Sequence, residues 1–226
     1  MTVVSGSRWP ELFSQAMRII DQASSGGIAF DDWTFGGGTA LMLQIGHRES
    51  DDIDLFFSDP QWLPLLNPMT QGYVLDVVPS DYETDGARVL KLAFSGIGEI
   101  DFICCAPLTI HYSERREVCG RNVAMELPAE IIAKKIFYRG ERMQPRDMFD
   151  IAAVVECCPE SDLVKELRPF AGQCEKALRA IARMDPATIG GVMKNLRIRP
   201  AFNGIPDIAL ERTGIFLERV VSEAER

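Results

Sequence analysis

The pattern of apolar and polar positions changes character once along the chain, near Leu127. Before that point, short runs rich in β-branched and aromatic residues are separated by glycine-containing turns, which is typical of strands. We expect two helices in this half, at 8–24 and 39–45. The expected strands lie at 28–35, 52–57, 73–78, 89–94 and 99–104, with an edge hairpin at 117–126.

From Pro128 onward the apolar positions recur with helical spacing. Pro128 suits the first turn of a helix, and Glu130 follows where the helix dipole favours an acid. We therefore expect an α+β protein, with a mixed α/β core over 1–127 and a helical region over 128–226 that completes a cleft. The expected helices of the second region lie at 128–140, 145–157, 161–168, 172–184, 186–195 and 207–224.

Length and composition narrow the class of protein. The chain has 226 residues, of which 46% are hydrophobic, enough for a substantial core. It contains no run of about 18 apolar residues, and its first residues lack the pattern of a signal peptide, so we expect no membrane partner. The six cysteines form no C-x-x-C pair, which indicates reduced thiols and a cytoplasmic location.

The net charge of −9 is unevenly divided along the chain. Residues 1–110 carry five Lys or Arg against fifteen Asp or Glu, whereas residues 111–226 carry nineteen against eighteen. Solvated surface accounts for most of these charges, and the overall balance does not favour generic nucleic-acid binding. The division also fits a metal site in the first half and phosphate contacts from the second.

The strongest candidate for chemistry is a pair of carboxylates, Asp52 and Asp54, in a predicted strand. Side chains two apart in a strand share a face, so both would aim at one point while Ile53 and Leu55 face the core. Adjacent carboxylates repel each other unless a cation compensates. Mg²⁺, with Mn²⁺ as an alternative, prefers such oxygen ligands. A solvated strand end is the competing interpretation of the pair taken alone.

The residues around this pair strengthen the metal interpretation. A glycine run at 36–38 and Thr39 open a short helix upstream, where bare backbone and helix N-terminal amides favour a phosphate. Ser50 offers a hydroxyl. Asp101 is the preferred third carboxylate, because its strand follows a hairpin and can lie beside the first, with Asp76 as its competitor.

A second polar block follows in the helical half. Lys135, Arg139 and Arg142 have the spacing of one helix face and form a basic stripe. Asp147 on the next helix is expected to hold Lys135 or Arg139 and to leave a cation for a triphosphate. We expect Lys135 to be exposed, and a solvated helix face is the alternative for the whole stripe. His47, beside the carboxylates, is expected to make a structural hydrogen bond.

These motifs together resemble the AbiEii/AbiGii-type toxin nucleotidyltransferases over residues 31 to about 155. That family lies in the polymerase-β-like nucleotidyltransferase superfamily, and some of its members are toxins of type IV toxin–antitoxin pairs. The resemblance implies Mg²⁺-dependent transfer of a nucleotidyl group from an NTP to an acceptor hydroxyl on RNA, such as a tRNA 3′ end, or on protein. It also implies a cognate antitoxin. The matching motifs are G-G-T-A-L, H-R-x-S-x-D-I-D-L-F, I-D-F, A-x-K-x and R-D-x-x-D.

The resemblance also implies a role for each matching residue. Asp51, an additional acid beside the pair, departs from the family pattern. Two alternatives stay open: an antibiotic-modifying nucleotidyltransferase, and a non-catalytic homologue that binds a nucleotide or a partner. The implied metal ligands are Asp52, Asp54 and Asp101, which are also catalytic together with Lys135. The implied nucleotide-binding residues are Gly37, Gly38, Thr39, Ser50, Lys135, Arg139 and Asp147.

Overall fold

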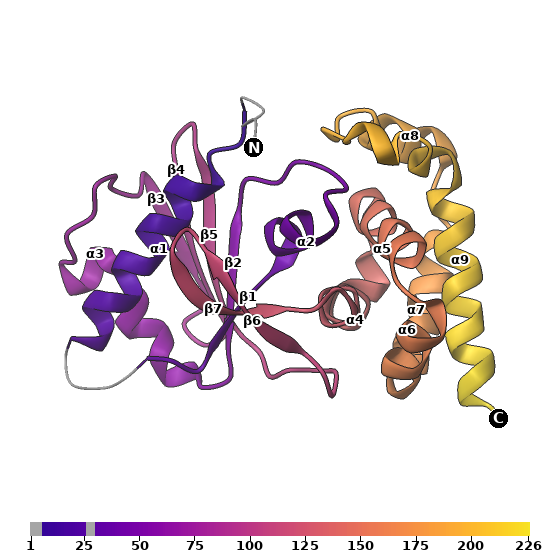
Figure 1. The fold of residues 1–226 in the computed structure, drawn as a ribbon, viewed down its shortest axis with the longest axis horizontal. Coiled ribbons are helices and arrows are strands. Elements are labelled where there is room, and N and C mark those ends of the chain that lie inside the picture. Colours follow the sequence, from indigo (N-terminus) through magenta and orange to yellow (C-terminus); the bar gives the residue numbers. More distant parts are fainter. Residues whose placement is uncertain (1–5, 26–29) are drawn as a thin grey trace. The chain divides into compact units, whose positions relative to one another are not determined.

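The computed structural model describes residues 6–25 and 30–226 (Figure 1). The chain divides into two compact units. The first takes the described residues of 1–40 together with 50–107 and 113–126. The second takes 41–49, 108–112 and 127–226, so that the helix α2 (Gly37–Ile45) contributes residues to both units.

The first unit is built on a sheet whose strands run in the order β3-β4-β5-β2-β1-β7-β6. The strand β2 lies at the middle, antiparallel to β1 and parallel to β5. The two strands that carry the predicted carboxylates are therefore neighbours, as expected. The strands are β1 (Trp33–Gly36), β2 (Ile53–Phe57), β3 (Asp81–Thr84), β4 (Val89–Phe94), β5 (Gly98–Cys104), β6 (Ser113–Val118) and β7 (Arg121–Glu126).

One face of this sheet is covered by the helix α1 (Trp9–Ser24), which packs against β2 and β5. Ile53 and Leu55 are buried, whereas Asp54 between them is half-buried, so the strand alternates as predicted. The rings of Phe13 and Phe35 lie 5.4 Å apart between α1 and β1. The remaining elements of this unit are the 3₁₀ helix η1 (Pro60–Leu66) and the short helix α3 (Pro68–Gln71).

The second unit is helical in its described elements, and the long helix α9 packs against α5 and α7. Fully buried aromatic residues, Phe149 and Phe216, belong to its core. Its α-helices are α4 (Pro128–Arg139), α5 (Pro145–Cys157), α6 (Glu160–Leu167), α7 (Ala171–Ile181), α8 (Pro186–Met193) and α9 (Ile205–Ala224). Its 3₁₀ helices are η2 (Gly140–Arg142), η3 (Arg168–Phe170) and η4 (Pro200–Phe202).

The mixed sheet followed by helices confirms the α+β class, and the predicted helices of the second half end within a few residues of the observed ones. The hairpin predicted around Gly120 is formed by β6 and β7 at one edge of the sheet. The first predicted strand is shorter than expected: β1 begins at Trp33, and residues 28 and 29 lie outside the described part of the chain.

The strand predicted over 73–78 is wrong, because this segment is irregular. Its amides bond to side chains of α1 instead of a neighbouring strand: Val74 N–H donates to Gln22 and Asp76 N–H donates to Gln15. The strand that pairs with β4 at this edge of the sheet is β3, which begins at Asp81 and whose side chains are all exposed. An exposed strand carries no alternation of buried and exposed positions, so the pattern could not reveal it.

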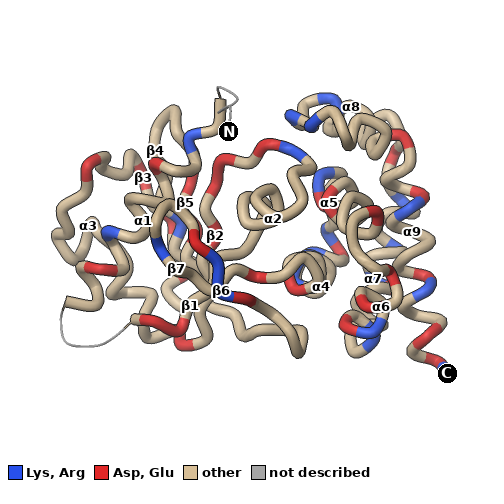
Figure 2. The backbone as a smooth tube through the Cα atoms, viewed as in Figure 1, with Lys and Arg blue, Asp and Glu red and all other residues tan. Residues whose placement is uncertain are grey.

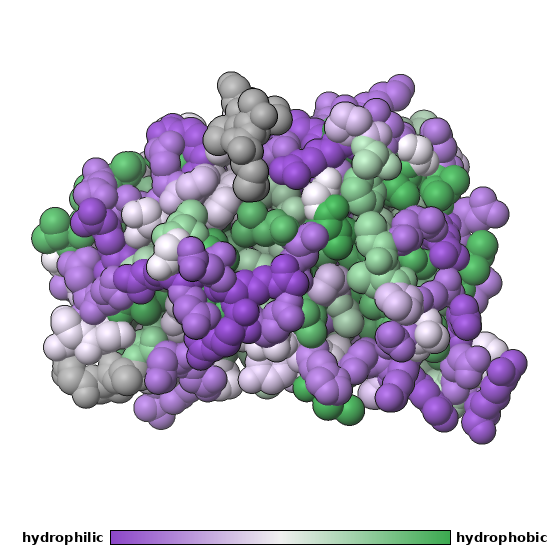
Figure 3. Space-filling view, viewed as in Figure 1, coloured by the Kyte–Doolittle hydropathy of each residue, from purple (hydrophilic) through white to green (hydrophobic). Residues whose placement is uncertain are grey.

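The surface mixes charged and hydrophobic residues. Figure 2 shows acidic residues gathered along the segment that leads into β2, where Glu49, Asp51, Asp52 and Asp54 follow closely in sequence. Figure 3 shows hydrophobic residues interspersed with hydrophilic ones on the face in view.

All six cysteines are free thiols. Within 6–25 and 30–226, no helix combines the length and the apolar character needed to cross a membrane.

Candidate active site

The glycine turn lies directly against the strand that carries the carboxylates. β1 and β2 pair so that Gly36 is the cross-strand neighbour of Asp54. A Cβ atom on Gly37 would lie 1.9 Å from Oδ2 of Asp54, and Gly37 has a φ of +68°, which disfavours any residue with a side chain. Glycine at this position therefore allows the backbone to touch the Asp54 carboxylate.

Asp54 and Asp101 are brought together by the pairing of β2 with β5. They are direct cross-strand neighbours, so their backbones lie about 5 Å apart and their side chains leave the same face. Burial raises the pKa of Asp101 to about 6, with a smaller contribution from the negative charge of Asp54. Oδ1 of Asp101 is buried and has no hydrogen-bond partner among the described residues. This pair has excess negative charge and an oxygen that can accept a ligand.

Asp52 lies just before β2 and makes a different contact. Its Oδ1 accepts a hydrogen bond of 3.0 Å from the N–H of Glu99. Burial raises the pKa of Asp52, although this hydrogen bond opposes the shift. Asp52 is thus tied to the beginning of β5, whereas Asp54 is paired with Asp101 further along that strand.

The donor set fits a divalent cation at the Asp54–Asp101 pair, because two carboxylates and an oxygen without a hydrogen bond suit a hard ion. As the side chains stand, no group of three or more His, Cys, Asp or Glu in the described part of the chain is placed to hold a metal ion. The three-carboxylate metal site with Asp52 therefore stays a prediction. Asp76, the competing third acid, lies in the irregular segment and forms an ion pair of 2.8 Å with Arg18.

The hydroxyl of Thr39 binds the backbone of the carboxylate segment. Thr39 is fully buried, and its hydroxyl donates a 2.5 Å hydrogen bond to the carbonyl of Asp52. The carbonyl of Ser50 accepts a hydrogen bond from the hydroxyl of Ser7. Gly38 lies half-buried in the first turn of α2. Thr39 therefore positions Asp52, and its expected contact with a nucleotide, like those of Gly38 and Ser50, stays a prediction.

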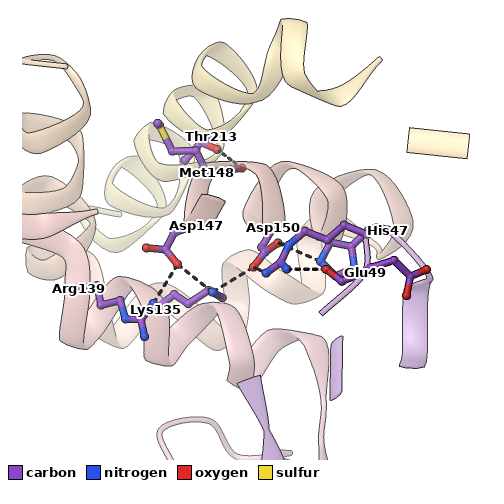
Figure 4. A network of polar contacts seen from close by, with 9 residues as sticks. His47, Glu49, Lys135, Arg139, Asp147, Met148, Asp150 and Thr213 are labelled. Atoms are coloured by element: carbon purple, nitrogen blue, oxygen red, sulfur yellow. Dashed lines mark hydrogen bonds and ion pairs between the residues drawn. The ribbon is translucent and has the colours of Figure 1, made fainter. Parts of the chain in front are cut away.

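The second polar block forms a buried ion network within the helical unit (Figure 4). Nζ of Lys135 lies 2.8 Å from Oδ1 of Asp147 and 3.1 Å from Oδ2 of Asp150. Arg48 donates to both oxygens of Asp150, at 2.7 and 2.9 Å, and Nε2 of His47 lies 2.9 Å from Oδ1 of the same residue. The expected pairing of Asp147 with Lys135 is confirmed, as is a structural hydrogen bond for His47.

Opposite charges compensate for burial throughout this network. Burial alone would raise the pKa of Asp150, but Arg48 and Lys135 hold that pKa well below its ordinary value. Burial likewise opposes the charged form of Lys135, yet Asp150 and Asp147 raise its pKa above the ordinary value. Burial lowers the pKa of His47 against the opposing effect of Asp150. Asp147 and Asp150 are therefore ionised, and Lys135 and Arg48 beside them carry their positive charges.

The expectation that Lys135 is exposed is wrong. Its side chain is only 11% exposed, because Asp147 and Asp150 of α5 cover it. Arg139, one turn further along α4, is 45% exposed and reaches Asp147 at 3.4 Å. Asp150 and Arg48 belong to the network but were not predicted as site residues. The R-D-x-x-D spacing was the available signal for Asp150, since it places Asp147 and Asp150 on one helix face.

Comparison with known proteins identifies a family. A family model described as the nucleotidyl transferase AbiEii toxin of a type IV toxin–antitoxin system matches residues 22–224. The solved structure of MenT4, a nucleotidyltransferase toxin from Mycobacterium tuberculosis, is similar with a TM-score of 0.57 and 16% identity, covering 96% of this chain and 85% of that chain. Comparison with curated proteins gives no match.

Two further solved structures are similar at lower TM-scores. JHP933 from Helicobacter pylori has a TM-score of 0.49 and 17% identity, covering 98% of this chain and 95% of that chain. ANT(2″)-Ia in complex with adenylyl-2″-tobramycin has a TM-score of 0.45 and 16% identity, covering 68% and 91%. The similarity to MenT4 concerns the fold, whereas the family model matches nearly the whole sequence. The chain therefore belongs to the AbiEii nucleotidyltransferase toxin family and is a nucleotidyltransferase.

Proposed function

We propose that this nucleotidyltransferase is the toxin of a type IV toxin–antitoxin pair and uses Mg²⁺ to transfer a nucleotidyl group from an NTP to RNA or protein. The observation that supports this proposal best is the pairing of Asp54 with Asp101 beside the Gly37 turn. The excess negative charge of this pair suits a divalent cation that also binds a triphosphate. The type IV toxin description of the family supports a cognate antitoxin as partner.

The residues of the first unit have separate proposed roles in metal binding and proton transfer. Asp54 and Asp101 would hold the cation together with Asp52, and Gly37 leaves the space that the Asp54 carboxylate occupies. When bound, a divalent cation supplies positive charge to the triphosphate and lowers the pKa of an attacking hydroxyl. Asp101, the direct neighbour of Asp54 across the strands, would also be the carboxylate that accepts the proton of that hydroxyl.

The proposed activity is tested by incubating the protein with each of the four labelled NTPs, Mg²⁺ and, in separate reactions, total RNA, a protein extract or an aminoglycoside. We expect label on RNA or on a protein, and its loss when EDTA is added. Label on an aminoglycoside alone, with resistance in cells, would instead indicate an antibiotic-modifying enzyme. Binding of NTP without transfer to any of these acceptors would indicate a non-catalytic homologue.

Gly37→Ala should reduce transfer about a hundredfold, because displacement of a catalytic group by about 1 Å has effects of this size. The new Cβ would overlap Oδ2 of Asp54 and force the carboxylate to move. The measurement is the initial rate of transfer. The matched control is Gly86→Ala, since Gly86 has a φ of +75° but a Cβ there would meet no described atom within 4 Å. Equal losses in both variants would attribute the effect to backbone strain alone.

Lys135→Ala should weaken NTP binding about ten- to a hundredfold, if its charge supports a phosphate contact worth roughly 1.5–3 kcal/mol. Because the side chain of Lys135 is largely covered by Asp147 and Asp150, we also expect a lower melting temperature. NTP affinity is measured by calorimetry below the unfolding transition. Lys134→Ala is the control, since Lys134 is also buried but lies 3.4 Å from Glu130. Equal, small losses of affinity would limit Lys135 to a structural role.

A further inference from the structure

A row of three charged side chains crosses the sheet at the candidate site. Lys91 on β4 is the cross-strand neighbour of Asp101 on β5, and Asp101 is the neighbour of Asp54 on β2. Cross-strand neighbours project from the same face of a sheet. The row therefore consists of one cation followed by two carboxylates, and it ends at Gly36 on β1, which has no side chain.

Lys91 compensates the charge of Asp101 without occupying its oxygen. Nζ of Lys91 makes a 2.5 Å contact with Oε2 of Glu99 but lies 3.5 Å from Oδ1 of Asp101. The first contact is a charge-assisted hydrogen bond. The second is long, and Oδ1 of Asp101 accepts no hydrogen bond within the described part of the chain. The oxygen therefore remains able to bind a cation.

The surrounding charges explain why a lysine is present. Glu99 and Asp101 alternate on β5 and share a face, Asp54 neighbours Asp101, and Asp52 bonds to the Glu99 amide. Carboxylates gathered in this way destabilise one another unless a positive charge lies close by. Lys91 supplies such a charge within the chain. The same positive charge repels a divalent cation that approaches Asp101.

We propose that Lys91 is an internal counter-ion that controls metal occupancy at the Asp54–Asp101 pair. Without metal, Lys91 neutralises Asp101. Asp54 and Asp101 would hold a divalent cation that accompanies the triphosphate of an NTP, while Lys91 would keep its hydrogen bond to Glu99. This role rests on the proposed function, because it requires the pair to hold a cation. Lys91 is a positioning residue that makes tight metal binding depend on the nucleotide.

The test is a titration of the protein with Mn²⁺ in the absence of NTP. The electron paramagnetic resonance signal of the free ion measures how much Mn²⁺ stays unbound. Lys91→Met removes the charge, and we expect it to bind Mn²⁺ about tenfold or more tightly than the wild type, because the positive charge that repels the incoming ion is gone. Lys91→Arg keeps the charge and should bind as the wild type does. Lys176→Met, at an exposed lysine paired with Glu141, is the matched control and should also bind as the wild type does.

Addition of a non-hydrolysable NTP should reduce the difference in Mn²⁺ affinity between Lys91→Met and the wild type. Equal Mn²⁺ affinities of the wild type and the folded neutral variant, with and without that NTP, would overturn the counter-ion role and leave the proposed metal site intact. Absence of Mn²⁺ binding by every variant under both conditions would instead overturn the metal site itself.

Circular dichroism checks the fold, and Lys91→Gln is the second neutral variant. Neutral variants that fold only when Mn²⁺ is added would support the role, because the ion replaces the missing charge. Variants that remain unfolded with Mn²⁺ would contradict it.

Discussion

Asp54→Asn should abolish nucleotidyl transfer while leaving the fold intact. The substitution keeps the size of the side chain but removes the charge needed to hold a divalent cation beside Asp101. A bound metal is worth several kcal/mol of transition-state stabilisation, and a loss of about 4 kcal/mol corresponds to roughly a thousandfold in rate. The free energy of unfolding should stay equal or rise, because the repulsion between the two neighbouring carboxylates is removed.

The rate of NTP transfer and the denaturation midpoint of Asp54→Asn test both parts of this expectation. Asp76→Asn is the matched control, since Asp76 lies in the irregular segment and pairs with Arg18. It should retain wild-type transfer. Normal transfer by a well-folded Asp54→Asn protein would remove the carboxylate pair from the mechanism. A large loss of stability would mean that Asp54 supports the fold.

Asp150→Asn should destabilise the helical unit by about 3–5 kcal/mol, the usual effect of removing one partner from a buried ion pair. Asp150 is fully buried, and its carboxylate is the shared partner of Arg48, Lys135 and His47. The substitution leaves buried cations without their main compensating charge. This loss is large compared with the roughly 5–15 kcal/mol that holds a typical domain folded. Urea denaturation of the wild type and the variant measures it.

Glu175→Ala is the control for Asp150→Asn, because it removes a carboxylate from an exposed pair with Arg179 in the same unit. We expect it to cost at most about 0.5 kcal/mol. Comparable losses in the two variants would show that the buried network contributes no more than an exposed ion pair does.

The same network predicts sensitivity to acid. The pKa values of Asp147 and Asp150 are lower in the folded protein than their ordinary values, so both carboxylates stabilise the fold above an unfolded pKa of about 3.9. That stabilisation is lost as the pH falls through the lower, folded values. The free energy of unfolding of the wild type should therefore fall as the pH drops below about 4, and that of Asp150→Asn should depend less steeply on pH in that range.

Local sequence patterns determined the elements around the carboxylates. The alternation of Ile53 and Leu55 with Asp52 and Asp54 predicted β2 and its buried face, because side-chain direction in a strand follows directly from position in the sequence. The glycine run predicted the turn before α2 for a similar reason, since a positive φ and a close backbone approach both exclude a side chain. Such features depend on neighbours along the chain.

Which carboxylate accompanies Asp54 was decided by the pairing of strands. The sequence favoured Asp101 over Asp76 without excluding either, because both lie in short apolar segments. Only the parallel register of β5 with β2 placed Asp101 beside Asp54, while side chains of α1 drew the segment around Asp76 out of the sheet. Register depends on contacts between segments far apart in sequence, which a local pattern does not contain.

The environment of Lys135 was likewise decided by tertiary structure. Helical periodicity placed it on the same stripe as Arg139 and correctly put Asp147 within reach. Periodicity gives the direction of a side chain about its own helix axis but does not say what packs against it. The packing of α5, together with Arg48 from nearly ninety residues earlier in the chain, buries Lys135 in an ion network and leaves Arg139 exposed.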